Sequence, residues 1–361
     1  MRVLLNTVGT SILTIWRDQV PQFDEECRTR LVRALSALPA SDRRLGAELT
    51  SIHSLLRQER LTLGDRLYFL VSETPEGQFV GSVLRDVSQQ MGLPSEIAVI
   101  EKLQSDDPRA FLQGLRNLVK TIAACYQNHT DRGHTLAINA TGGYKAQIAF
   151  AGLIGQVFRL PVFYQFEAFP QAVELPPLPV DFAMDQWLAY RCILEALESG
   201  NELVSVNDPR VKSLPDSLRV LLEPSQGYVV LNALGTLYHR GFWSRFASQA
   251  SALVPQPSGL DPADKKIVYE DHNRGKHRGL EEWLTRVIRV PYVTRIQTFW
   301  YHPDYPGLSD FEPDPTAGDR VIAWYCEHGA ATKSYVFLSE NDPFKAKAAA
   351  ADLARRIIGP R

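Results

Sequence analysis

The sequence predicts an α/β fold: a doubly wound parallel sheet, then a mainly helical middle module, then a small α+β domain. Three observations lead to this prediction. Short apolar runs alternate with longer helical stretches over about the first 168 residues, which is typical of a parallel sheet with helices on both faces. A proline-rich segment then ends the alternation. The last ~100 residues follow the order strand, helix, antiparallel meander and helix, which indicates an α+β domain.

The first domain, predicted for residues 1–170, contains five short apolar runs that have the length of buried strands. Stretches with helical spacing lie between them: Glu26–Leu38, Ser82–Met91 and Phe111–Tyr126. In a doubly wound order the first and fourth strands are neighbours, and ligands bind in the crevice beyond their carboxyl ends. The predicted strands are Val3–Leu5, Leu67–Val71, Ile97–Ile100, Thr135–Ile138 and Val162–Phe166.

The middle module is predicted for residues 181–254, because four prolines between Pro170 and Pro179 mark a boundary before it. Two helices, a short strand and a further helix fit a winged-helix-like module. Acidic residues outnumber basic ones here, which disfavours DNA binding and favours a dimer-forming spacer. The predicted elements are helices Trp187–Leu197, Leu214–Leu222 and Leu234–Phe246 with the strand Tyr228–Leu231.

The C-terminal domain, predicted for residues 263–361, follows a linker at Pro255–Gly259. Its helices are expected at Leu280–Ile288 and Pro343–Ile358. A loop rich in Pro, Asp and Gly is expected from Tyr301 to Asp319, and its carboxylates are typical of a solvated surface rather than a metal site. The strands are expected at Ile267–Tyr269, Val293–Trp300, Val321–Cys326 and Tyr335–Leu338.

Composition restricts the possible functions of the chain. The formal net charge is −2, so any contact with nucleic acid must be local. Four widely spaced cysteines show no metal-ligand spacing, and together with the lack of a signal sequence they indicate the reducing cytoplasm. No apolar run approaches the ~20 residues that span a bilayer, so no membrane partner is expected.

Two polar, glycine-bearing loops follow the first and fourth predicted strands. Asn6-Thr7-Val8-Gly9-Thr10-Ser11 comes after the first, and Asn139-Ala140-Thr141-Gly142-Gly143-Tyr144-Lys145 comes after the fourth and opens a helix. Glycines, hydroxyls and a lysine at such a position can hold phosphate groups. The pattern is neither a P-loop nor the dinucleotide fingerprint, so ATP and NAD are disfavoured.

This pair of loops resembles the CRISPR-associated Rossmann-fold sensors, called CARF domains, over about the first 170 residues. The resemblance implies a homodimer that binds a cyclic oligoadenylate, most often cyclic tetra-adenylate, across its two-fold axis, and needs no other cofactor. Lys145 would balance phosphate charge, while Thr10, Ser11 and Thr141 would donate hydrogen bonds. Whether such a sensor also hydrolyses its ligand stays open. The ligand site would comprise Gly9, Thr10, Ser11, Asn139, Thr141, Gly142, Gly143 and Lys145.

A second candidate site is a basic segment before the Leu280–Ile288 helix. His272, Arg274, Lys276, His277 and Arg278 lie within seven positions, and the following helix and strand add Arg286, Arg289 and Arg295. Cations near aromatic residues such as Trp300, Tyr301 and Trp324 suit single-stranded RNA.

Residues from about Lys265 to Ile358 resemble the RelE superfamily of mRNA interferases, through Arg274–Arg278, Pro291–Ile296 and the terminal helix. The resemblance implies metal-independent cleavage of mRNA on the ribosome. Proton transfer would fall to Lys276 or His277, while Arg274, Arg278 and Arg295 would stabilise the transition state. Weaker candidates are His272, Tyr325 and Lys333.

The predicted function is therefore that of a type III CRISPR ancillary effector, an endoribonuclease activated by a cyclic oligoadenylate. The alternative is a ligand-sensing winged-helix transcriptional regulator without nuclease activity. The acidic middle module disfavours this alternative.

Overall fold

The computed structural model describes residues 1–104, 107–176, 184–200, 203–270, 275, 277–305 and 307–359. They form two compact units. Unit 1 holds residues 1–180, 220–223 and 231–241, and unit 2 holds residues 181–219, 224–230 and 242–361. The predicted middle module is thus divided between the units, and the three-domain boundaries stay a prediction.

Unit 1 contains a six-stranded sheet in the order β3-β2-β1-β4-β5-β6, in which β6 alone runs antiparallel to its neighbour. The first and fourth strands are neighbours, as the sequence predicts. Their register pairs Asn6 with Asn139, so both strands end at the same level. The strands are β1 (Arg2–Thr7), β2 (Arg66–Ser72), β3 (Ser95–Ile100), β4 (Thr135–Asn139), β5 (Val162–Tyr164) and β6 (Val173–Leu175).

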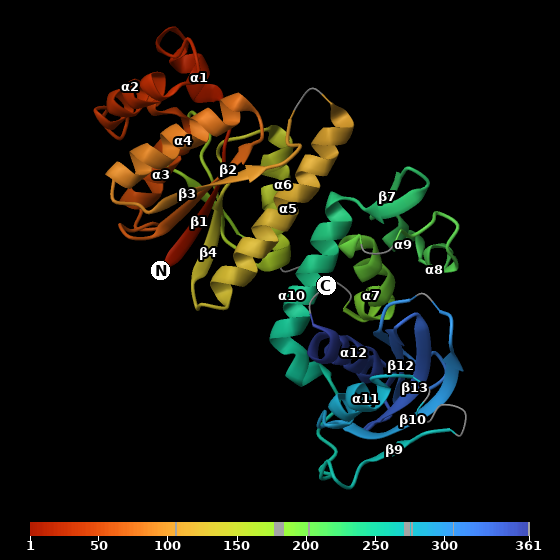
Figure 1. The fold of residues 1–361 in the computed structure, drawn as a ribbon. Helices are drawn as coiled ribbons and strands as arrows, with labels where there is room; N and C mark the ends of the chain where they lie inside the picture. The colour runs from red at the N-terminus through yellow and green to blue at the C-terminus, as the bar shows by residue number, and fades with distance from the viewer. Residues whose placement is uncertain are drawn as a thin grey trace. The chain divides into compact units, whose positions relative to one another are not determined.

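Helices cover both faces of this sheet, and each face has its own apolar core (Figure 1). One core packs α1 to α4 against alternate strand residues such as Leu4 and Phe69. The other core packs α5, α6 and the start of α10 against the intervening residues, such as Val3 and Leu5. The parallel-sheet prediction is therefore confirmed. The helices are α1 (Ser11–Ile15), α2 (Glu25–Ser36), α3 (Gly46–Arg57), α4 (Pro75–Gln90), α5 (Pro108–Thr130) and α6 (Lys145–Phe158), with short 3-10 turns at Arg17–Gln19 and Arg43–Leu45.

The region after the proline-rich segment follows the order helix, bridge, two short helices, hairpin and long helix. Ser205 forms an isolated bridge with Tyr228. The second helix predicted here is shorter than expected, because Leu222 already belongs to a strand. The elements are α7 (Met184–Ser199), α8 (Pro209–Lys212), α9 (Asp216–Arg219), β7 (Leu222–Ser225), β8 (Tyr228–Leu231) and α10 (Ala233–Leu253).

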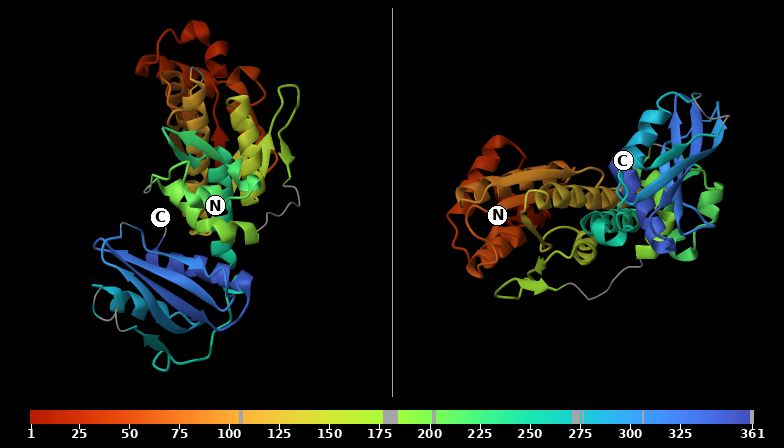
Figure 2. Two further views of the ribbon diagram at one scale, coloured as in Figure 1. Left: turned by 90° about the vertical axis from the view of Figure 1, so that its right-hand side faces the viewer. Right: turned by 90° about the horizontal axis from the view of Figure 1, so that it is seen from below.

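Unit 2 contains a five-stranded sheet in the order β11-β12-β13-β10-β9, antiparallel except for the β10–β9 pair. Helices α11 and α12 lie on the same side of it (Figures 1 and 2). None of the helices among the described residues is long and apolar enough to cross a bilayer. The elements are β9 (Lys266–Val268), α11 (Leu280–Ile288), β10 (Val293–His302), β11 (Asp310–Pro313), β12 (Arg320–Glu327), β13 (Ala330–Leu338), α12 (Pro343–Leu353) and a closing turn at Ala354–Ile358.

Candidate functional site

The two glycine-bearing loops of unit 1 touch one another beyond the ends of β1 and β4. A Cβ atom on Gly9 would lie only 2.9 Å from the backbone nitrogen of Gly143, and Gly143 itself has φ = +102°. The Thr7 hydroxyl donates to the carbonyl oxygen of Gly142, which fixes one loop to the other. The sequence-based expectation that these two loops lie together is therefore confirmed, and glycine at 9 and 143 is required by the close approach.

A buried carboxyl lies behind both loops and was not predicted from the sequence. Glu48, on α3, is 1% exposed, and its Oε1 accepts the Gly9 backbone N–H at 2.7 Å. Its Oε2 is buried without a hydrogen-bond partner among the described residues. Burial raises the pKa of Glu48, against the lowering effect of the Gly9 hydrogen bond. The sequence held one signal for it: Glu48 shares a helical apolar face with Leu45, Leu49 and Ile52.

The buried asparagines at the strand ends hold the loops in place. Asn139 donates from Nδ2 to Asn6 Oδ1 at 2.9 Å and to Ser51 Oγ at 2.8 Å. The Asn139 Oδ1 accepts from the hydroxyl of Thr141 at 2.6 Å, and that hydroxyl accepts from the backbone of Gln165 at 3.1 Å. Asn139 and Thr141 therefore support the loop from inside. Their predicted contacts with a ligand stay a prediction.

Three of the predicted ligand-binding residues present free polar atoms to solvent. Thr10, Ser11 and Lys145 are exposed, and their side chains form no hydrogen bond or ion pair with any part of the chain that the structure describes. Lys145 is the first residue of α6, and the Tyr144 backbone N–H at this helix end is already held by the Gln147 side chain at 2.6 Å. A glycine cradle, two hydroxyls and one ammonium group at a helix start are suited to an anion with several phosphates.

Exchanging Glu48 for glutamine is expected to flatten the pH dependence of unit 1 stability. Because the folded-state pKa is raised, the stabilising contribution of this carboxyl is present at acid pH and is lost as the pH rises through that pKa. Glutamine keeps an oxygen for the Gly9 N–H and cannot ionise. Urea denaturation should show that the free energy of unfolding falls less between about pH 5 and pH 8 for Glu48→Gln than for wild type. The two free energies should converge at acid pH. Parallel curves would contradict a buried, titrating Glu48.

The predicted catalytic residues of unit 2 are only partly described. Arg274 and Lys276 lie outside the described residues, as does His272. His277 is buried, with Nδ1 2.9 Å from the Thr332 hydroxyl and Nε2 3.1 Å from the Glu327 carbonyl oxygen. Burial lowers the pKa of His277, which favours the neutral ring. With both nitrogens engaged, this histidine has the environment of a structural residue, and its proposed proton transfer stays a prediction.

The structure does not bring together Arg278 and Arg295, the other two predicted catalytic residues that it describes. Arg278 is exposed at the start of α11, on the side of the sheet where His277 packs against Thr332. Arg295 lies on the opposite face, with its guanidinium carbon 4.1 Å from the centroid of the Phe337 ring. Because successive residues of a strand point to opposite faces, the weaker candidates Tyr325 and Lys333 are separated in the same way.

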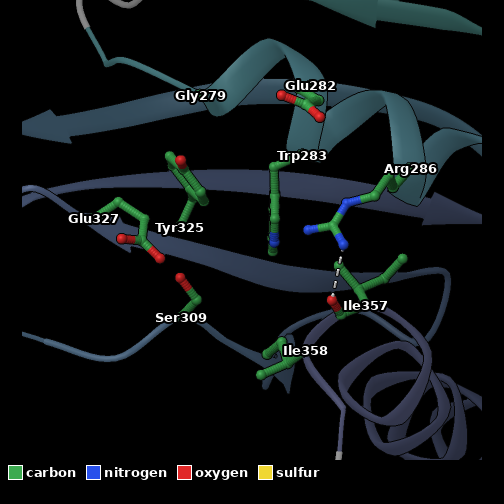
Figure 3. Close-up of a pocket in the computed structure, with 9 residues that line it drawn as sticks. All are labelled: Gly279, Glu282, Trp283, Arg286, Ser309, Tyr325, Glu327, Ile357 and Ile358. Atoms are coloured by element: carbon green, nitrogen blue, oxygen red, sulfur yellow. Dashed lines mark hydrogen bonds between the residues drawn. The ribbon is translucent and has the colours of Figure 1, made fainter.

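A pocket of about 530 Å³ lies beside Arg278, at the start of α11 (Figure 3). Glu327 and Ser309 lie across from Tyr325 at one end, and Arg286 lies at the other end beyond Trp283. Tyr325 donates to the Arg278 carbonyl oxygen at 3.1 Å, and Arg286 donates to the Ile357 carbonyl oxygen at 3.3 Å. Burial, reinforced by the charge of Glu327, raises the pKa of Tyr325. The pocket is lined by Gly279, Glu282, Trp283, Arg286, Ser309, Tyr325, Glu327, Ile357 and Ile358.

This pocket adds two carboxylates, Glu282 and Glu327, to the predicted basic segment. A carboxylate, a phenol and a guanidinium in one cavity are groups that can accept a proton, donate a proton and stabilise negative charge. The described residues include no cluster of three or more His, Cys, Asp or Glu side chains that could hold a metal ion.

Comparison with known proteins finds a matching family model and solved structures that include the two described below. Residues 43–178 match the family model described as CRISPR-associated protein (Cas_APE2256). Protein VC1899 from Vibrio cholerae is 10% identical, with 94% of this chain and 77% of that chain covered and a TM-score of 0.28. Can2 from Sulfobacillus thermosulfidooxidans, solved in complex with cyclic tetra-adenylate, is 11% identical, with 79% and 84% covered and a TM-score of 0.25. Residues 43–178 build most of the parallel-sheet unit, so this part of the chain is similar to a CRISPR-associated protein family.

Proposed function

We propose that this chain is a type III CRISPR ancillary effector, in which binding of a cyclic oligoadenylate to unit 1 activates cleavage of mRNA by unit 2. The observation that carries the proposal is the contact between the two glycine-bearing loops at the ends of β1 and β4. Their exposed hydroxyls and Lys145 are available to phosphate oxygens. The match of residues 43–178 to a CRISPR-associated family supports the same assignment.

Cyclic tetra-adenylate is the proposed ligand, bound across the two-fold axis of a homodimer. A symmetric ring can contact both copies of each loop, which suits an isologous interface. The solvent-facing side of α6 supports such an interface, because small and apolar residues meet solvent there. Ala149 and Leu153 are exposed there, and a Cβ on Gly152 would meet no atom within 4 Å.

For unit 2 we propose metal-independent cleavage of mRNA on the ribosome. The 2′-oxygen of the RNA attacks the adjacent phosphorus, the bond from phosphorus to the 5′-oxygen breaks, and a 2′,3′-cyclic phosphate and a 5′-hydroxyl result. A base takes the 2′-hydroxyl proton, and an acid protonates the leaving 5′-oxygen. Since both ring nitrogens of His277 are hydrogen-bonded, proton transfer is assigned to Lys276 in preference to His277. Arg274 and Arg278 are assigned to stabilise the negative charge that develops on the phosphate in the transition state. Arg286 of the adjacent pocket is a further cation that can do so.

The proposal is tested by adding the protein to translating ribosomes with and without cyclic tetra-adenylate. Cleavage should depend on the ligand, because activation requires that the ligand bind the active arrangement better than the resting one. Lys276→Ala should remove cleavage and leave ligand binding unchanged. Equal cleavage with and without the ligand would contradict activation, and undiminished cleavage by Lys276→Ala would contradict the assigned residue.

Replacing Lys145 by alanine is expected to weaken binding of cyclic tetra-adenylate at least tenfold, because a charge-assisted hydrogen bond to phosphate contributes about 1.5–3 kcal/mol. Titration calorimetry on the full chain measures this. Arg132→Ala is the matched control, since Arg132 is an exposed cation in the turn before β4, at the opposite end of that strand. Equal affinities for wild type and Lys145→Ala would exclude Lys145 from the ligand site.

A further inference from the structure

The face of the five-stranded sheet that points away from α11 and α12 carries an organised set of aromatic and cationic side chains. Cross-strand pairing places them in three rows over β12, β13 and β10. Trp324, Lys333 and Trp300 form the first row, Ile322, Tyr335 and Gln297 the second, and Arg320, Phe337 and Arg295 the third. All nine are half-buried or exposed, whereas the residues that alternate with them in β12 and β13, together with Ile296 and Thr298 of β10, are buried on the other side of the sheet.

The aromatic rings of this sheet face contact one another. The centroids of Trp300 and Trp324 are 6.0 Å apart, and Tyr305 stacks on Trp324 at 5.7 Å. In the second row Phe299 stacks on Tyr335 at 4.0 Å. A register shift after Thr298 in β10 lets both Phe299 and Trp300 contribute rings to this face. So many large aromatic side chains at one surface are typical of an interaction site.

Cations are placed directly over these rings. The Lys333 ammonium group lies 3.8 Å from the centroid of Trp324 and 5.0 Å from that of Trp300. Within the described part of the chain, neither Lys333 nor Arg295 has a carboxylate partner, while Arg320 is paired with Asp314 at 2.6 Å. Glu312 is engaged with the Trp324 indole N–H at 2.7 Å. Two positive charges are thus available to an anionic partner at this surface.

The geometry points to single-stranded RNA as the partner of this sheet face, bound by base stacking on the tryptophans and tyrosines and by phosphate contacts to Lys333 and Arg295. Arg295 pairs with Phe337, which follows Lys333 by four residues in β13. This spacing corresponds to about 13 Å along the strand. A stacked strand covers that length with about four nucleotides at about 3.4 Å each. A duplex keeps the faces of its bases stacked inside the helix, so they are not available to these aromatic rings.

This inference rests on the proposed function, in which RNA is the substrate, and it adds a second surface to which that RNA can bind. The sheet face lies on the opposite side of the sheet from His277 and the pocket beside Arg278. It is expected to bind RNA without the ribosome.

The test uses the full chain and fluorescently labelled 2′-O-methyl RNA of two to twelve nucleotides, with and without cyclic tetra-adenylate. Such RNA has no free 2′-hydroxyl and cannot be cleaved by the proposed chemistry, so binding and cleavage are measured apart. Affinity should rise steeply up to about four nucleotides. Trp324→Ala should weaken binding between about five- and a hundredfold, whereas Trp324→Phe should stay within a few-fold of wild type.

The salt dependence of RNA affinity distinguishes phosphate contacts at this sheet face from a general attraction of the protein to polyanions. Lys333→Gln should reduce the slope of log affinity against log salt by about 0.7, the value for one lost phosphate contact on a single strand. Lys347→Gln, a lysine of α12 paired with Asp185, should leave the slope unchanged. Thermal melts of each variant verify folding.

The inference is overturned if wild type binds no single strand, if duplex RNA binds as tightly, or if Trp324→Ala and Lys333→Gln both bind like wild type. Binding of 2′-O-methyl RNA together with intact ribosomal mRNA would instead contradict the proposed cleavage and leave this surface standing.

Discussion

Gly142→Val is expected to abolish measurable binding of cyclic tetra-adenylate and to lower the free energy of unfolding of unit 1 by about 1–3 kcal/mol. A Cβ atom at position 142 would lie 2.0 Å from Oε1 of Glu48 and 2.6 Å from its Cδ. The Glu48 side chain is buried and holds the Gly9 N–H, so it cannot move aside into solvent. The added side chain therefore displaces the Gly9 loop as well. Calorimetric titration and urea denaturation measure the two effects.

Thr135→Val is the matched control for this substitution. Thr135 is exposed at the start of β4, at the end of that strand away from both glycine-bearing loops. Valine there should change the free energy of unfolding by at most about 0.5 kcal/mol, and the ligand should bind as it does to wild type. If Gly142→Val bound the ligand at full strength, the loop contact would not be the ligand site.

Arg191→Met is expected to lower the free energy of unfolding of unit 2 by about 3–5 kcal/mol, the usual loss when one member of a buried ion pair is removed. Arg191 is 1% exposed and lies between two carboxylates. It donates to Asp310 at 2.7 Å and to the Phe311 carbonyl oxygen at 2.8 Å, and it is paired with Glu195. Without the guanidinium, both carboxylates would be left in a largely buried setting.

Arg210→Met provides the comparison, because Arg210 is an exposed arginine of α8 that pairs with Asp208. Its removal should change the free energy of unfolding by at most about 1 kcal/mol. Denaturation monitored at the tryptophans measures both variants. A loss below about 1 kcal/mol for Arg191→Met would show that the buried charges have another source of compensation.

The Arg191 cluster also has a consequence for activation. Arg191 lies on α7, in the predicted middle module, and its partners Asp310 and Phe311 lie on β11 of the C-terminal sheet. These segments belong to one compact unit. We therefore expect α7 and the five-stranded sheet to move as one body in any activation step.

Local pattern was sufficient to predict most of the strands and the neighbouring positions of the first and fourth, but not the order of the second sheet, in which β10 pairs with β13 and not with β12. The runs at Leu67–Val71 and Thr135–Ile138 are short and apolar, and the structure has β2 and β4 there. The Leu280–Ile288 helix has the predicted bounds. Helix α3 was missed because its serines and its glutamate weaken the apolar pattern, although these polar side chains are buried and hydrogen-bonded. Strand β11 was missed because its proline and two carboxylates are typical of a loop.

The sequence by itself determined the parallel sheet, the positions of the two glycine-bearing loops and the basic character of the segment before α11, because each depends on residues close together in the chain. Only the tertiary structure decided that Glu48 lies behind both loops and that Arg295 and His277 lie on opposite faces of one sheet. These facts depend on how distant segments pack and on strand register, in which a shift of one residue turns a side chain to the other face.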